Sequence, residues 1–91
     1  MESTGALQGI RVLDFSSVLS GPFATMLLAD LGAEVVRVER PDGGDALRHS
    51  PPQRHGESAY FFCANRNKKS IVVDVKAPPG LALIRRLLPG F

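Results

Sequence analysis

Residues 10–39 read as an apolar stretch, a helix-like stretch and a second apolar stretch, and this order constrains the fold more than any other feature. Residues 10–15, Ile-Arg-Val-Leu-Asp-Phe, are apolar almost throughout, which is typical of a strand buried on both faces of a parallel sheet. Within residues 20–31 apolar side chains recur at helical spacing, with Ser20 placed as the N-cap. Residues 34–39, Glu-Val-Val-Arg-Val-Glu, predict a second strand. Together these elements form a βαβ unit, whose strands are parallel.

The rest of the chain adds one strand and one helix to this unit. Residues 70–75, Ser-Ile-Val-Val-Asp-Val, predict a third strand, and residues 81–88 predict a second amphipathic helix. Between the strands, residues 41–64 are rich in proline and glycine and predict a long connecting loop, in which residues 60–62 favour neither helix nor strand. The inventory predicts an α/β fold, a partial doubly wound, Rossmann-like parallel sheet. Three strands and two helices do not cover both faces of such a sheet, so we expect residues 1–91 to be the incomplete N-terminal segment of a larger domain.

The composition is that of an ordinary globular protein. The net charge is +2 and the basic residues are scattered, whereas a nucleic-acid-binding domain usually carries a dense basic stripe. No stretch is long and apolar enough to span a bilayer, and residues 1–5 resemble neither a secretory signal nor a transit peptide. We therefore expect a cytoplasmic protein with no nucleic-acid or membrane partner. Cys63 is the only cysteine, and its surroundings predict a small half-buried side chain rather than a catalytic thiol.

Three polar stretches lie where the predicted sheet would meet a ligand, and each is open to two interpretations. Ligands of α/β folds bind beyond the carboxyl ends of the strands, and helix N-termini favour phosphates. The turn at residues 16–22 is therefore either a nucleotide-contacting loop or an ordinary capped turn. Glu39 and Arg40 either bind ribose and phosphate or form a solvated pair at the strand end. Residues 65–70, Asn-Arg-Asn-Lys-Lys-Ser, either hold phosphate groups or form a solvated turn.

Isolated carboxylates and histidines provide no complete catalytic or metal site. Asp14, near the carboxyl end of the first predicted strand, is placed to face the ligand crevice, whereas Asp30 is expected to face solvent from the last turn of a helix. Neither these two nor Asp74 has an evident base or oxyanion partner. His49 and His55 lack cysteines or carboxylates at metal-ligand spacing, so no metal site is predicted.

Three blocks of sequence carry a family resemblance. The first is Gly-Ile-Arg-Val-Leu-Asp-Phe at residues 9–15, followed by Gly-Pro-Phe-Ala-Thr-Met at residues 21–26. The second is Asp-Leu-Gly-Ala-Glu-Val-Val-Arg-Val-Glu-Arg-Pro at residues 30–41, and the third is Asn-Arg-Asn-Lys-Lys-Ser-Ile at residues 65–71. In order and spacing these blocks resemble the N-terminus of family III CoA-transferases of the CaiB/BaiF type, which include formyl-CoA transferase and α-methylacyl-CoA racemase relatives. The match covers nearly all of the chain.

The resemblance implies an acyl-CoA:carboxylate CoA-transferase that works as an interlocked homodimer. It implies coenzyme A or an acyl-CoA as substrate across the carboxyl ends of the strands, a small carboxylic acid as the second substrate, no metal and no covalently bound cofactor. Val18, Leu19 and Ser20 would line the nucleotide end, and Arg40 would contact the adenosine diphosphate part. The residues expected along the same ligand are Val73, Asp74, Val75 and Lys76.

The resemblance places the chemistry elsewhere in the family's chain. There, a single aspartate attacks the acyl-CoA thioester and passes CoA to the incoming acid through a mixed anhydride. That aspartate lies downstream of residue 91, so residues 1–91 alone are expected to be inactive. Two alternatives remain: an α-methylacyl-CoA racemase segment, and a non-catalytic fragment that binds CoA or pairs with a longer subunit. A nicotinamide-dinucleotide domain is disfavoured because the first turn lacks Gly-x-Gly-x-x-Gly.

Overall fold

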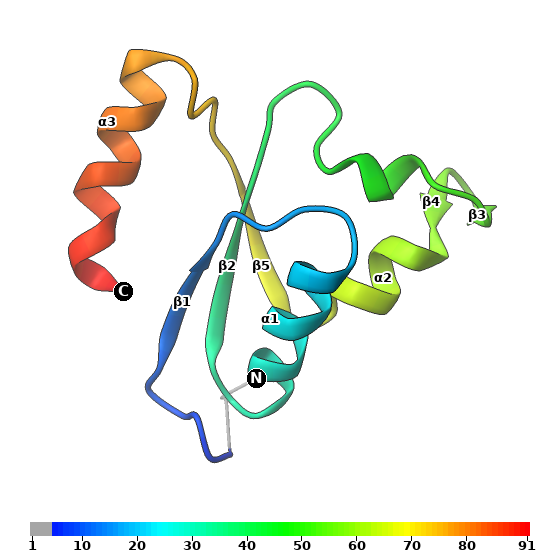
Figure 1. Cartoon of the computed structure of the whole chain (residues 1–91), viewed down its shortest axis with the longest axis horizontal. Coiled ribbons are helices and arrows are strands. Elements are labelled where there is room, and N and C mark those ends of the chain that lie inside the picture. The colour runs from blue at the N-terminus through cyan, green and yellow to red at the C-terminus, as the bar shows by residue number, and fades with distance from the viewer. Residues whose placement is uncertain (1–4) are drawn as a thin grey trace.

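A three-stranded parallel sheet forms the centre of the molecule in a computed structural model that describes residues 5–91 (Figure 1). Its strands, in spatial order, are β1 (Arg11–Asp14), β2 (Glu34–Glu39) and β5 (Lys68–Val72). Parallel neighbours need a crossover connection, and α1 (Ser20–Asp30) makes the one between β1 and β2. The predicted α/β class, the parallel sheet and the βαβ unit are therefore confirmed.

Helices lie on both faces of this sheet. On one face α1 lies beside α2 (Ala59–Asn65), and on the other lies α3 (Pro78–Leu87), which ends in the 3-10 turn η2 (Leu88–Gly90) (Figure 1). Figure 1 shows α3 apart from α1 and α2, with the three strands between them.

Alternation along β2 gives each face its own apolar core. Successive side chains of a strand point to opposite faces. Val35 accordingly packs with Ala29 of α1 and with Ala33. Val38, on the opposite face, packs with Ile84 of α3 and with Val73. The central strand is thus covered on both sides, as its apolar sequence indicates.

The segment expected to be a long connecting loop contains short regular elements. It holds the 3-10 helix η1 (Ala46–His49), an antiparallel hairpin of β3 (Gln53–Arg54) and β4 (Glu57–Ser58), and the start of α2. His55 and Gly56 form the hairpin turn with φ of 53° and 77°, as a two-residue turn of type I′ requires. Leu47 of η1 and Phe61 of α2 are buried, so this segment folds onto the sheet face that α1 also covers.

Several predicted boundaries are wrong by a few residues. The third strand is residues 68–72 rather than residues 70–75, because the backbone of the lysines before it already pairs with β2. The N-cap of α1 is Leu19, and Ser20 is the first helical residue with no capping hydrogen bond. The helix predicted over residues 81–88 is residues 78–87, because its first turn accommodates prolines, which have no N–H to leave unpaired there, and Leu88 begins η2.

Cys63 and most of the apolar stripe predicted for the first helix differ in burial from the sequence-based expectation. Cys63 is exposed rather than half-buried, because α2 turns its Phe61 and Ala64 toward the sheet instead. Of the apolar residues at helical spacing along α1 and at its C-cap, Met26 is buried, but Phe23, Leu27 and Leu31 are exposed. Within residues 5–91 no helix combines the length and the apolar character needed to cross a membrane.

Candidate functional site

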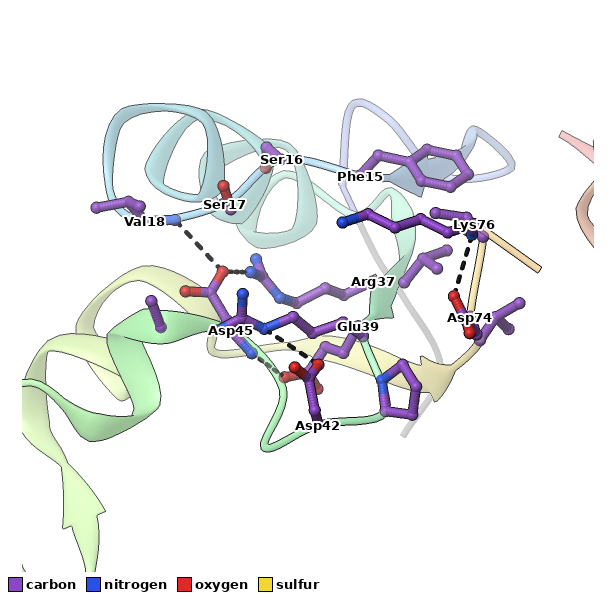
Figure 2. Close-up of a pocket in the computed structure, with 16 residues that line it drawn as sticks. Phe15, Ser16, Ser17, Val18, Arg37, Glu39, Asp42, Asp45, Asp74 and Lys76 are labelled. Carbon is purple, nitrogen blue, oxygen red and sulfur yellow. Dashed lines mark hydrogen bonds and ion pairs between the residues drawn. The ribbon is translucent and has the colours of Figure 1, made fainter. Parts of the chain in front are cut away.

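A cleft of about 640 Å³ opens at the carboxyl ends of the three parallel strands (Figure 2). Residues 15–18, which follow β1, form one wall, and residues 73–76, which follow β5, form another. Between them lie residues 37–42 together with Asp45 and Ala46. In parallel α/β sheets this edge is where ligands bind, because the strand-to-helix loops converge there.

Most of the residues predicted to contact a ligand lie on this cleft. Val18, Arg40 and residues 73–76 line it. Leu19 and Ser20 do not, because α1 begins there and their side chains are exposed outside the cleft. Phe15 and Asp45 also line the cleft, and neither was predicted as a ligand contact.

The turn after β1 is folded around Asp14, which is buried beneath the cleft instead of lining it. Its carboxylate accepts hydrogen bonds from the backbone N–H of Ser16 (2.8 Å) and the hydroxyl of Thr25 (2.7 Å). Burial opposes ionisation, but the bonds from Ser16, Thr25 and Lys68 outweigh it and hold the pKa of Asp14 below its usual value. The turn is tight enough that a Cβ on Gly21 would lie 2.5 Å from the Cβ of Ser16.

Two exposed basic residues, Arg40 and Lys76, line the cleft. Arg40 Nε donates to the carbonyl oxygen of Gly44 (2.8 Å) and lies 3.6 Å from the Asp42 carboxylate. The backbone N–H of Lys76 donates to Asp74 Oδ1 (3.1 Å), as in an Asx turn. The loops after β2 and β5 thus bring two cations to the same opening, with carboxylates beside them.

A network of buried ionic side chains fills the sheet face under α1 and α2. Arg37 of β2 is only 2% exposed; it pairs with Asp45, lies 3.9 Å from Asp14 and donates to Asn65 (2.8 Å). Lys68 of β5 donates to Asp14 (3.1 Å) and to Asn65 (2.9 Å). Burial lowers the pKa of Arg37 and of Lys68, and Asp14 partly opposes this effect. Buried charges persist where they are paired and hydrogen-bonded; both cations meet this condition, although Arg37 Nε has no hydrogen-bond partner.

Glu39 extends this network toward the cleft. It is 4% exposed and accepts two hydrogen bonds from Arg48, at 2.6 Å and 2.7 Å, and another from the hydroxyl of Ser70. The bonds from Arg48 and Ser70 lower the pKa of Glu39 although burial opposes them. The interpretation of Glu39 and Arg40 as a solvated pair is therefore wrong for Glu39, whose two oxygens are occupied by protein donors.

No residue of the Asn-Arg-Asn-Lys-Lys-Ser block lines the cleft, although Asn65 and Ser70 hydrogen-bond to the cleft-lining Arg37 and Glu39. Arg66 and Asn67 donate to the Asp30 carboxylate, at 2.8 Å and 2.7 Å. Asp30 is exposed, as expected, but it joins the end of α1 to the start of β5. Arg66 and Asn67 thus form an exposed turn, as one of the two interpretations predicted, and this turn also joins α1 to β5. The sequence signal for the network is a pair of charged residues, Arg37 and Glu39, at alternate positions of an otherwise apolar buried strand.

The parallel sheet and the cleft at its carboxyl edge define an α/β protein of the class that binds ligands at the carboxyl ends of its strands. Comparisons with known proteins identify the family. The family model described as CoA-transferase family III matches residues 7–90. The chain is 53% identical over 87 residues to succinyl-CoA:glutarate CoA-transferase of Mus musculus, covering 94% of this chain and 20% of that protein. It is 45% identical over 86 residues to formyl-CoA:oxalate CoA-transferase of Bradyrhizobium sp., covering 93% of this chain and 20% of that protein.

Solved structures agree with this assignment. A hypothetical protein from Mycobacterium tuberculosis superimposes with a TM-score of 0.82 at 42% identity, covering 94% of this chain and 23% of that chain. A CAIB/BAIF family protein from Brucella suis gives a TM-score of 0.82 at 40% identity, covering 91% of this chain and 23% of that chain. The chain belongs to CoA-transferase family III, and it spans about a fifth of the length of the curated relatives that it matches.

Proposed function

We propose that this chain forms one wall of the coenzyme A site of an acyl-CoA:carboxylate CoA-transferase. The observation that carries the proposal is the cleft at the carboxyl edge of the sheet, which Arg40 and Lys76 share with the Val18 turn. Coenzyme A is polyanionic, and charge-assisted hydrogen bonds from such cations are the strong contacts available to its phosphates. Membership in CoA-transferase family III supports a CoA thioester as the ligand.

The proposed ligand follows the cleft from the turn after β1 to the loop after β5. The nucleotide end lies at Val18 and the diphosphate at Arg40, and the remainder runs along residues 73–76. Leu19 and Ser20 lie outside the cleft, so in this arrangement they contact the ligand only through their backbone at its mouth.

The second substrate in this proposal is a small dicarboxylate. The relatives named above are described as transferring CoA to glutarate or oxalate, and both of these acids carry two carboxylates. We propose succinyl-CoA or a similar short acyl-CoA as the donor. The proposal includes a homodimer located in the cytoplasm. Light scattering on the purified protein would test the dimer, because it measures the molar mass in solution.

The nucleophile of the proposed reaction is an aspartate outside residues 1–91. Its carboxylate attacks the thioester carbonyl, the C–S bond breaks, and CoA departs as a thiolate while the acyl group and the aspartate form a mixed anhydride. The thiolate attacks the enzyme's side of the anhydride, which releases the first acid and forms an enzyme–CoA thioester. The acceptor carboxylate then reverses both steps and departs as an acyl-CoA. Asp14 and Asp45 are held in buried ion pairs, which supports a nucleophile from elsewhere.

The direct test uses purified full-length protein, in which residues 1–91 are joined to the region that carries the proposed nucleophile; all kinetic tests below use this protein. It is incubated with succinyl-CoA and glutarate, and the products are followed by mass spectrometry. We expect glutaryl-CoA and succinate in equal amounts, with no glutaryl-CoA when glutarate is omitted. No transfer to glutarate, oxalate or other short dicarboxylates would count against the proposal. Exchange of the α-hydrogen of a 2-methylacyl-CoA in deuterated water, without any acid acceptor, would favour a racemase instead.

The contribution of the cleft is tested with Arg40→Gln. Loss of a charge-assisted contact to a phosphate should raise the KM for succinyl-CoA about tenfold while leaving the KM for the acid unchanged. Arg54→Gln is the matched control, because Arg54 is exposed in β3 and does not line the cleft. Equal kinetics in the two variants would remove Arg40 from the binding site.

A further inference from the structure

Val18, on the wall of the cleft, has a backbone conformation that needs external support. Its φ is +69°, in the left-handed region, where a β-branched residue is a genuine outlier. Such a conformation costs on the order of 1–3 kcal/mol and persists only where surrounding contacts fix it. The side chain of Val18 is 53% exposed, so close packing of that side chain does not supply the support.

The contact that fixes this turn comes from Asp45, far away in the sequence. The Val18 N–H donates to Asp45 Oδ2 at 3.3 Å, and the same carboxylate pairs with Arg37 beneath the cleft (Figure 2). Its Oδ1 accepts from the N–H of Leu47 (2.7 Å), and its own N–H donates to Glu39 Oε1 (3.2 Å). One buried carboxylate thus joins the turn after β1, the end of β2 and the start of η1.

The geometry assigns Asp45 a role as a positioning residue, which holds the Val18 turn in its strained conformation so that the nucleotide end of the CoA site is formed before substrate arrives. This inference rests on the proposed function. Arg37 orients the carboxylate, and η1 fixes its other oxygen, so Asp45 has little freedom to follow the turn if the turn moves. Preformed sites bind more tightly because less ordering remains to be done on binding.

The test is Asp45→Asn, measured with two donors that differ only in the nucleotide. Asparagine keeps an acceptor for the N–H of Leu47 but loses the charge that faces Arg37. Succinyl-CoA should show a KM raised about tenfold, equivalent to about 1.4 kcal/mol. Succinyl-pantetheine, which has the same thioester but no nucleotide, should show a KM within twofold of the wild-type value. A general loss of structure would raise both constants together, and that result would overturn the inference, as would two unchanged constants.

Hydrogen exchange without substrate tests the positioning role apart from the activity. The Val18 amide should exchange at least tenfold faster in Asp45→Asn than in the wild type. Asp30→Asn is the control, because it removes a hydrogen-bonded carboxylate at the other end of α1, and it should leave this rate unchanged. If Asp45→Asn does not fold, Arg37→Gln/Asp45→Asn replaces the buried ion pair with two neutral amides and serves for the same comparisons. A wild-type protein that transfers no CoA defeats the proposed function; an unchanged Val18 exchange rate defeats the role of Asp45.

Discussion

Replacing Glu39 by glutamine tests whether the buried ionic network stabilises the sheet edge that forms the cleft. The wild-type carboxylate receives four donors: Arg48 twice, the hydroxyl of Ser70 and the N–H of Asp45. In Glu39→Gln one oxygen becomes an NH2 group that faces these donors, and the negative charge opposite Arg48 is lost. The variant keeps the size and shape of the side chain, so the change is electrostatic.

The expected loss follows from the burial of the two partners. Removing one partner of a fully buried ion pair costs about 3–5 kcal/mol, and leaving a buried hydrogen-bonding group unsatisfied costs about 1–3 kcal/mol. Glu39 is nearly inaccessible, but the side chain of Arg48 is 39% exposed and water can solvate it in the variant. We therefore expect Glu39→Gln to lower the free energy of unfolding by about 2 kcal/mol, a value within the range for an unsatisfied buried group rather than that for a fully buried ion pair.

Hydrogen exchange measures this loss where it occurs. A local destabilisation of about 2 kcal/mol speeds exchange about thirtyfold, since each 1.4 kcal/mol is tenfold. We expect that increase in peptides covering β2 and β5. Glu34→Gln is the matched control, because it makes the same substitution in the same strand at a surface ion pair with Lys69. Its exchange should stay within twofold of the wild type.

The pH dependence gives an independent check. The pKa of Glu39 is lowered in the folded protein, so its stabilisation is complete above the unfolded-state value of about 4.3 and is lost as the pH falls through the folded-state value. The difference between wild type and Glu39→Gln should therefore be full at pH 7 and shrink below about pH 4. A constant difference across this range, or equal effects of Glu39→Gln and Glu34→Gln, would refute the electrostatic reasoning.

Two further substitutions probe the helix after the cleft and the deepest part of the network. Gly80→Ala would place a Cβ 1.9 Å from the carbonyl oxygen of Asp74, so α3 must move to accept it. We expect thermal unfolding to show a destabilisation of about 1–3 kcal/mol. An unchanged melting temperature would show that α3 shifts without an energetic cost. Lys68→Met removes a hydrogen bond that lowers the pKa of Asp14. Because stability from such a carboxylate is lost as the pH falls through its folded-state pKa, acid unfolding followed by circular dichroism should begin at a higher pH in this variant; an unshifted acid transition would contradict the pairing.

The sequence by itself determined the framework of the fold. Apolar runs bounded by serine, glycine and proline define strands and helices locally, and the bounds of β2 agree with the prediction for residues 34–39. The order strand–helix–strand then requires a parallel pair joined by a crossover helix. Three linked motifs also identified CoA-transferase family III, which the family model supports over residues 7–90. The resemblance implied that Val18, Arg40 and residues 73–76 lie along one ligand; the structure brings them to one cleft, and their contact with a ligand stays a prediction.

Only the tertiary structure decided which charged residues are buried and what they hold. Arg37 and Glu39 belong to a strand that also contains valines, and no local pattern indicates that their partners are Asp45, Arg48 and Asn65. Asp45 is the N-cap of η1 and Arg48 lies within η1, in the 41–64 stretch whose composition indicates a loop, and Asn65 is the last residue of α2. The physical reason is that a charge is buried only when distant groups supply its counter-charge and hydrogen bonds. Packing of the 41–64 segment onto the sheet meets that requirement. The spacing of residues along the sequence does not predict this packing.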